Sequence, residues 1–340
     1  MRFYAVILLC SLFSVPAVAD EIVDIGLTLP YTTSVVVDGL NNPSCVTFSP
    51  NGTLTVCDSG NGRVITVSDG EVTDYITGFP TEHWKVDADT GTKRFKLGPL
   101  SAVWVDDKTL AVTNAGLGDG SETVLFFDGP GTANDGKPTN SVAATTDDAK
   151  DKGEGNLTGL SLSDDGSTLF VAGQGSDAAT WVLSADVKTR KLTPMFSADA
   201  EGIEVNSPMA TMVDGDSVLA LYSGAGGKDD GMIVQWDIAT KKVTAKWTLP
   251  GLTDPMGFSK MPGQDIMAVV DNNWSLTEVK DGRIALVQLV DGSEEAQVMV
   301  VADKLKGPVS CAFAPTMELY IAQLGTEFDA GKGQILKISE

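Results

Sequence analysis

The stretch "GLNNPSCVTFSPNGTLTVCDSGNGRV" (residues 39–64) has the pattern of two short β-strands joined by a Ser-Pro-Asn-Gly turn. Apolar and polar residues alternate on both sides of the turn, as they do in a hairpin. Pro43 opens the first strand, Phe48 follows five residues later, and Leu54 opens the second strand. This spacing decides the fold because the chain repeats it.

The same register recurs along the rest of the chain. Each copy has a proline, then an apolar residue five positions later, then a leucine that opens the second strand. The copies are Pro99, Trp104 and Leu110; Pro208, Val213 and Leu219; and Pro308, Phe313 and Leu319. Looser copies begin at Leu157 and Pro255. Six copies roughly 50 residues apart are typical of propeller arrays.

Each copy contains three or four short strands separated by turn residues, and no segment shows the 3.6-residue apolar stripe of a helix. The sequence therefore predicts an all-β protein, a six-bladed β-propeller with four-stranded blades. The predicted blades start near residues 41, 97, 155, 206, 253 and 306.

The two ends of the repeat predict how the ring closes. The sixth copy stops after its third strand, and "YTTSVVVDGL" (31–40) is a spare strand before the first copy. We expect this N-terminal strand to complete the last blade, because closure leaves the terminal blade without an unpaired edge.

Residues 1–19 have the pattern of a secretory signal peptide, with one early arginine, an apolar run and Ala17-Val18-Ala19 before the cleavage point. We expect residues 20–340 to form a single propeller domain, exported and monomeric, without a membrane span. The net charge of −22 makes nucleic acid an unfavourable partner.

The opening stretch resembles the NHL-type propeller repeat, which has a proline-led first strand, a Pro-x-Gly turn and a second strand that ends in Asp before Asn-x-Arg-Val. Asp58, Asn61 and Arg63 match that pattern in the first copy, and the other copies keep its skeleton. The resemblance implies a fold shared by secreted binding and scaffold proteins. It is also shared by calcium-dependent lactonases of the SMP-30/gluconolactonase type and by proteins similar to strictosidine synthase.

In such rings, the loops entering the first strands and the loops between second and third strands gather on one face of the channel. We expect this polar face to bind a ligand through Asn42, Asp58, Asn206, Asp254, Asp271, Asn273 and Trp274. Oxygen-bearing side chains suit Ca²⁺, and the resemblance to the lactonases places Asn206 and Asp254 roughly where metal ligands would stand. The Glu-Gly-Pro and Asn-Gly-Leu/Ile-Ala motifs expected of those enzymes are missing.

Two further features of the sequence carry predictions. His83, the only histidine, lies in an insertion (80–99) that also carries Lys85, Lys93, Arg94 and Lys96; we interpret it as a structural or exposed hairpin, with contact to an anionic ligand as the alternative. Trp274 beside Asn272 and Asn273 is a combination that stacks on and hydrogen-bonds a sugar or peptide, with plain packing as the other interpretation.

Three cysteines follow the predicted leader. Pairing Phe48 with Leu54 places Cys45 opposite Cys57, where a disulfide is feasible. Cys311 lies on the opposite face of its own blade from the face that Cys45 occupies. The three thiols either converge between blades six and one, where one bond would staple the ring, or point away from each other.

The sequence thus predicts a secreted module that binds a protein, glycan or small molecule through its channel face, with no catalytic residues assigned. The alternative is a calcium-dependent hydrolase of lactones or esters on the same face. A third hypothesis is a cell-surface or matrix protein that only displays its loops.

Overall fold

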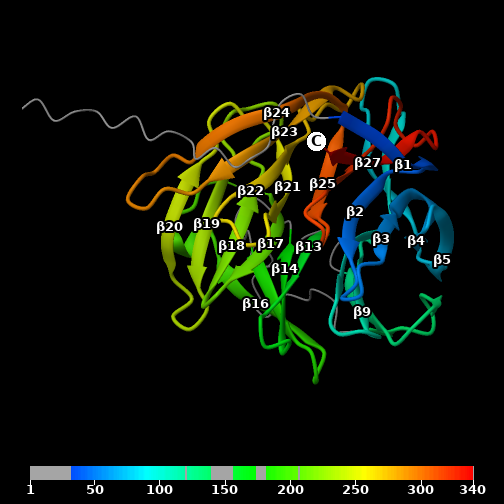
Figure 1. The fold of residues 1–340 in the computed structure, drawn as a ribbon, viewed down its shortest axis with the longest axis horizontal. Helices are drawn as coiled ribbons and strands as arrows, with labels where there is room; N and C mark the ends of the chain where they lie inside the picture. The colour runs from blue at the N-terminus through cyan, green and yellow to red at the C-terminus, as the bar shows by residue number, and fades with distance from the viewer. Residues whose placement is uncertain (1–31, 119–120, 139–155, 174–180, 206, 340) are drawn as a thin grey trace, which may run out of the picture.

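The computed structural model describes residues 32–118, 121–138, 156–173, 181–205 and 207–339. These segments form six β-sheets arranged around a central axis and a separate two-stranded hairpin, with short 3₁₀ turns such as η1 (Ser59–Asn61) and no α-helix (Figure 1). The predicted all-β, six-bladed propeller is confirmed. The predicted signal peptide lies outside the described residues, and within them no helix is long and apolar enough to cross a bilayer.

The first three blades are antiparallel sheets whose strands follow one another from the channel outwards. Blade one contains β2 (Pro43–Phe48), β3 (Leu54–Asp58), β4 (Arg63–Ser68) and β5 (Glu71–Thr77). Blade two contains β8 (Pro99–Trp104), β9 (Leu110–Asn114), β10 (Thr123–Phe127) and the short β12 (Lys137–Pro138). Blade three contains β13 (Leu157–Leu162), β14 (Thr168–Gly173), β15 (Trp181–Asp186) and β16 (Lys191–Ser197).

The last three blades have the same order. Blade four contains β17 (Pro208–Asp214), β18 (Ser217–Tyr222), β19 (Met232–Asp237) and β20 (Val243–Thr248). Blade five contains β21 (Pro255–Lys260), β22 (Met267–Asp271), β23 (Asp281–Gln288) and β24 (Gln297–Lys306). Blade six contains β25 (Pro308–Phe313), β26 (Leu319–Gln323), β27 (Gly333–Ser339) and β1 (Thr32–Leu40).

The ring closes through β1, which completes blade six as the sequence predicted. β1 pairs antiparallel with β27, with Val35 opposite Leu336 and Val37 opposite Ile335, and the two strands lie side by side in Figure 1. The inner strands contact one another in the cyclic order β2, β8, β13, β17, β21, β25 and back to β2. The first and last strands of the described chain therefore share one sheet.

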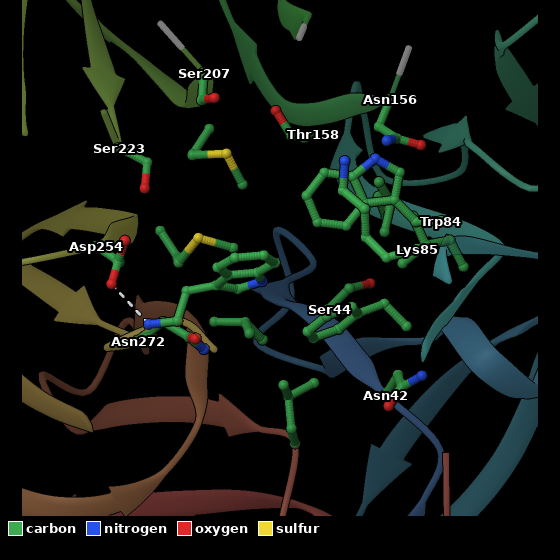
Figure 2. A pocket seen from close by; sticks show the side chains of 18 of the residues that line it. Asn42, Ser44, Trp84, Lys85, Asn156, Thr158, Ser207, Ser223, Asp254 and Asn272 are labelled. Carbon is green, nitrogen blue, oxygen red and sulfur yellow. Dashed lines mark hydrogen bonds between the residues drawn. The ribbon is translucent and has the colours of Figure 1, made fainter. Parts of the chain in front are cut away.

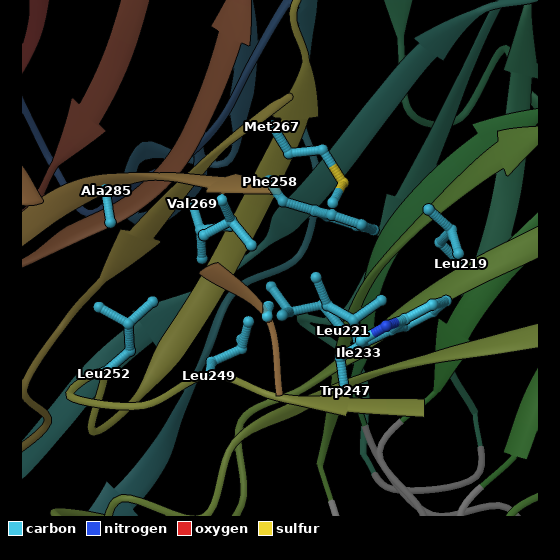
Figure 3. Packing of buried hydrophobic residues seen from close by; sticks show 12 residues of the cluster. Leu219, Leu221, Ile233, Trp247, Leu249, Leu252, Phe258, Met267, Val269 and Ala285 are labelled. Atoms are coloured by element: carbon cyan, nitrogen blue, oxygen red, sulfur yellow. The ribbon is translucent and has the colours of Figure 1, made fainter. Parts of the chain in front are cut away.

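The apolar core is divided into six clusters, one between each pair of neighbouring blades. Between blades four and five, Leu219, Leu221 and Trp247 pack against Phe258 and Met267 (Figure 3). Alternate side chains of a strand point to opposite faces of its sheet, so each blade contributes one face to each of two clusters. Every blade therefore depends on both neighbours.

Blade two departs from the regular pattern. Its outer strand β12 is short, and the preceding β11 (Gly131–Thr132) pairs parallel with β5 of blade one. The sequence indicated one long polar excursion over 128–156. Part of it joins two blades, and residues 139–155 lie outside the described residues.

The cysteines do not converge at the ring closure. Cys45 lies opposite Cys57, as predicted from the register, and both are buried in the cluster between blades one and two. Cys311 is buried between blades five and six. All three are free thiols in this structure. The hypothesis of a staple between blades six and one is therefore wrong, because Cys45 and Cys311 face away from that boundary.

We predict that a disulfide-carrying oxidant such as oxidised glutathione joins Cys45 to Cys57. The two residues are directly opposite each other in the register of β2 and β3, and cross-strand neighbours are within disulfide range. Interaction with the Cys57 thiol also lowers the pKa of Cys45, which favours the thiolate that attacks a disulfide. Thiol titration of the denatured chain should show Cys45 and Cys57 consumed and Cys311 retained. A Cys57→Ser variant is the control, and peptide mapping that links Cys311 would contradict the prediction.

A second prediction concerns the closure itself. Val37 is 6% exposed whereas Val35, on the same strand, is 53% exposed. Val37→Asp should lower the free energy of unfolding by about 3 kcal/mol or more, because it buries a charge in the cluster between blades six and one. Val35→Asp should cost about 0.5 kcal/mol. Urea denaturation measures both, and equal losses would show that β1 does not hold the ring.

Candidate ligand-binding cavity at the channel mouth

A cavity of about 800 Å³ lies at one mouth of the channel, and residues from all six blades line it. Its walls come from the loops that enter the inner strands, from the loops between second and third strands, and from a hairpin of β6 (Glu82–Val86) and β7 (Lys93–Leu97). The polar residues that line it are Asn42, Ser44, Glu82, His83, Lys85, Asn156, Thr158, Ser207, Ser223, Asp254 and Asn272. We call this space the channel-mouth cavity (Figure 2).

The hairpin contributes an aromatic wall. It is inserted between blades one and two, yet its Trp84 contacts Trp274 of blade five with ring centroids 6.2 Å apart. Phe95 stacks on Trp274 at 6.0 Å and also contacts Phe328, which follows the second strand of blade six, at 4.6 Å. The hairpin therefore connects opposite parts of the ring through aromatic contacts at the cavity.

Trp274 also packs closely against the β18–β19 loop. A Cβ atom added at Gly226 would lie 2.8 Å from Cε3 of Trp274, so only glycine allows this approach. The packing interpretation of Trp274 therefore holds, since it packs against Phe95 and Gly226, and its place in the cavity lining leaves ligand binding as a prediction.

Asp254 holds two loops of the cavity in place. Asp254 is 1% exposed, and its Oδ1 accepts a hydrogen bond from the Gly227 N–H at 2.9 Å. Its Oδ2 accepts one from the Trp274 N–H at 2.7 Å, and Figure 2 shows the position of Asp254 with a dashed hydrogen bond to its carboxylate. Burial is the main influence on its pKa and raises it, the two backbone hydrogen bonds oppose this, and the nearby charge of Asp271 adds to the rise. Asp254 is a buried carboxylate at the cavity wall.

Asp58 and Asp271 occupy equivalent positions at the ends of β3 and β22, and both are fully buried. Asp58 accepts hydrogen bonds from the Asn41 N–H at 2.7 Å and from Nε of Arg63 at 2.7 Å. Asp271 accepts from the Asp254 N–H at 2.7 Å and pairs with Arg283 at 3.1 Å. Neither lines the cavity; each fixes the loop that enters the inner strand of its blade.

Two of the predicted asparagines are also engaged with the protein. Asn42 lines the cavity, and its Nδ2 donates to the Lys96 carbonyl at 3.1 Å and to the carboxylate of Asp329. Asn273 donates to the Asp281 carbonyl at 3.1 Å and does not line the cavity. Asn206 lies outside the described residues.

Three cavity side chains link neighbouring blades by donating to the carbonyl of the residue that opens the next inner strand. Ser44 donates to Pro99 at 3.0 Å, Thr158 to Pro208 at 2.8 Å, and Asn272 to Pro308 at 3.0 Å. A hydroxyl that has donated its proton still offers lone pairs. The channel end of the cavity therefore presents mainly hydrogen-bond acceptors.

The sequence did not identify Ser44, Thr158, Trp84, Phe95 or Phe328 as site residues. Ser44 and Thr158 follow the residues that open their inner strands, and this spacing could have indicated them. The aromatic contacts had no comparable signal, because Trp84 and Phe95 belong to an insertion whose path across the ring depends on its tertiary packing.

The metal prediction rests on Asn206 and Asp254. Within the described segments no group of three or more His, Cys, Asp or Glu side chains could hold a metal ion. His83 lines the cavity without a second histidine in the chain.

Comparison with known proteins adds evidence on the fold. No family profile matches the chain, and no curated protein matches it. Among solved structures, an apo-form soluble aldose sugar dehydrogenase from Escherichia coli is 13% identical with a TM-score of 0.59, over 91% of this chain and 99% of that one. The likeness is one of fold.

Two further structures give the same result. The PQQ-bound aldose sugar dehydrogenase from Streptomyces coelicolor is 11% identical with a TM-score of 0.58, over 92% of this chain and 99% of that one. Hydrazine synthase from Kuenenia stuttgartiensis is 17% identical with a TM-score of 0.52, over 84% and 77%. The propeller fold is supported, and the resemblance to NHL and SMP-30 proteins stays a prediction from the sequence.

We expect Asp58→Ala to lower the free energy of unfolding by about 3 kcal/mol, because it leaves the Nε of the partly buried Arg63 and the Asn41 N–H without their acceptor. Asp74→Ala is a matched control, since Asp74 pairs with the same arginine at 2.8 Å but is half exposed; it should cost less than about 1 kcal/mol. Chemical denaturation of both variants measures the difference. An unchanged free energy of unfolding in Asp58→Ala would show that the carboxylate does not fix this loop.

Proposed function

We propose that this chain is an exported propeller that binds a hydroxyl-rich ligand, a mono- or oligosaccharide, in the channel-mouth cavity. The observation that carries the proposal is the combination of an aromatic wall with hydrogen-bonding side chains from several blades around a space of about 800 Å³. Cavities of this size accommodate small molecules.

The chemistry of the lining supports a sugar over other small ligands. Apolar faces of a sugar ring pack on aromatic side chains, and sugar hydroxyls donate to the acceptors that Ser44 and Thr158 present. Sugar dehydrogenases stand among the proteins of similar fold. Fold likeness alone does not fix a function, so the site carries the proposal.

The residues present do not fit pyrroloquinoline quinone (PQQ), the group named for the Streptomyces protein. PQQ is a tricarboxylate and needs several cations around it. Lys85 is the one lysine or arginine among the described residues of the lining, and Glu82 and Asp254 add negative charge. We therefore derive no redox step from the resemblance of fold.

The test is direct binding of saccharides to the full chain, measured by isothermal titration calorimetry with and without EDTA. Trp274→Ala should weaken binding at least 10-fold, about 1.4 kcal/mol, because the variant removes the centre of the aromatic wall. Trp104→Ala is the control, since Trp104 donates to Thr55 on the flank of blades one and two, away from the cavity.

Melting curves of both variants separate lost binding from lost folding. Equal binding by Trp274→Ala and the parent chain would contradict the proposed site. Turnover of lactones or esters that EDTA abolishes would support the calcium-dependent hydrolase in its place.

A further inference from the structure

We propose that the channel-mouth cavity prefers a saccharide that carries a protonated amino group, and that Asp254 receives this group. The inference rests on the proposed function and names the ligand class within it. It follows from the charges around Asp254, compared with those around the two other buried aspartates of the channel mouth, Asp58 and Asp271.

Asp254 differs from the two other buried aspartates of the channel mouth. Asp58 pairs with Arg63 at 2.7 Å and Asp271 pairs with Arg283 at 3.1 Å. Among the described residues no ion pair includes Asp254, although it is 1% exposed. A buried carboxylate is ordinarily paired, and here the missing partner would come from the ligand.

The carboxylate can accept further hydrogen bonds. Its two oxygens provide about four lone-pair positions, and the described hydrogen bonds use two of them, from the N–H groups of Gly227 and Trp274. Both donors are uncharged, so they compensate the charge only in part.

Burial raises the pKa of Asp254, and Asp271 adds to this, whereas Lys280 lowers it as the weakest of the named influences. A cation at the carboxylate would lower this pKa. The unused acceptor positions of the carboxylate and its uncompensated charge therefore both favour a protonated amino group on the ligand.

The rest of the cavity agrees with a cationic group. Trp274, whose backbone N–H donates to Asp254, lines the cavity next to this carboxylate and gives the ligand an apolar surface there. Lys85, the cation of the lining, has its Nζ 4.0 Å from the centroid of the Trp84 ring, in the hairpin wall. The chain carries a net charge of −22, which raises the local concentration of cationic ligands.

The experiment compares four ligands of one ring type: glucose, glucosamine, N-acetylglucosamine and glucuronate. They are titrated into the full chain by calorimetry at about pH 6, below the pKa of the amine. We expect glucosamine to bind about 10-fold more tightly than glucose, N-acetylglucosamine to lose that gain, and glucuronate to bind most weakly.

Asp254→Asn should bring glucosamine to the affinity of glucose. Asp229→Asn is the matched control, because Asp229 is exposed, accepts from the Gly251 N–H at 3.1 Å and lies outside the cavity lining; it changes the net charge equally and should keep the preference. If Asp254→Asn fails to fold, the relative affinities of the four sugars for the parent chain still test the preference for an amino group.

Glucose and glucosamine binding equally would overturn this inference and leave the proposed function standing. A preference for glucosamine that survives in folded Asp254→Asn would also overturn it. Absence of binding by all four sugars and by their oligomers would overturn the proposed function itself.

Discussion

The pairing of β1 with β27 is the constraint on which the rest of the structure depends. Each apolar cluster lies between two blades, so no blade buries its faces alone. Without β1, the sheet of blade six would end in an unpaired edge at β27, and the cluster containing Val37 and Ile335 would open to water. Closing the ring is therefore what allows six marginal sheets to form one stable unit.

The same constraint builds the cavity. Closure brings the inner strands together around the channel, and short side chains such as Ser44 and Thr158 then donate to the carbonyls that open the next blades. These bonds hold the inner strands in register and leave acceptor lone pairs at the channel mouth. The polarity of the site is thus a consequence of the way neighbouring blades are joined.

Three buried aspartates show how one residue type acquires different roles. Asp58 and Asp271 end second strands and have arginine partners, so their charges are used within the fold. Asp254 lies one residue before an inner strand, receives only backbone N–H groups and faces the cavity. The resemblance to sugar dehydrogenases concerns the path of the backbone, whereas the ligand depends on such differences of partner.

The sequence by itself determined the propeller, its six blades, the closing strand and the strand register that places Cys45 opposite Cys57. These features follow from the alternation of apolar and polar residues within each strand and from the repeated spacing of the copies. Both are local patterns, so they can be read directly along the chain. It also placed Asn42, Asp254 and Trp274 near the channel. Only the tertiary structure decided that Asp58 and Asp271 serve the fold, that Cys311 faces blade five, and that Trp84 and Phe95 reach Trp274. Asp58 and Asp271 find their arginines within their own blades, but whether a carboxylate is paired or faces the cavity depends on side-chain packing that a strand pattern does not encode. Trp84 and Phe95 meet a ring from another blade, and tertiary packing, not spacing along the chain, brings these rings together.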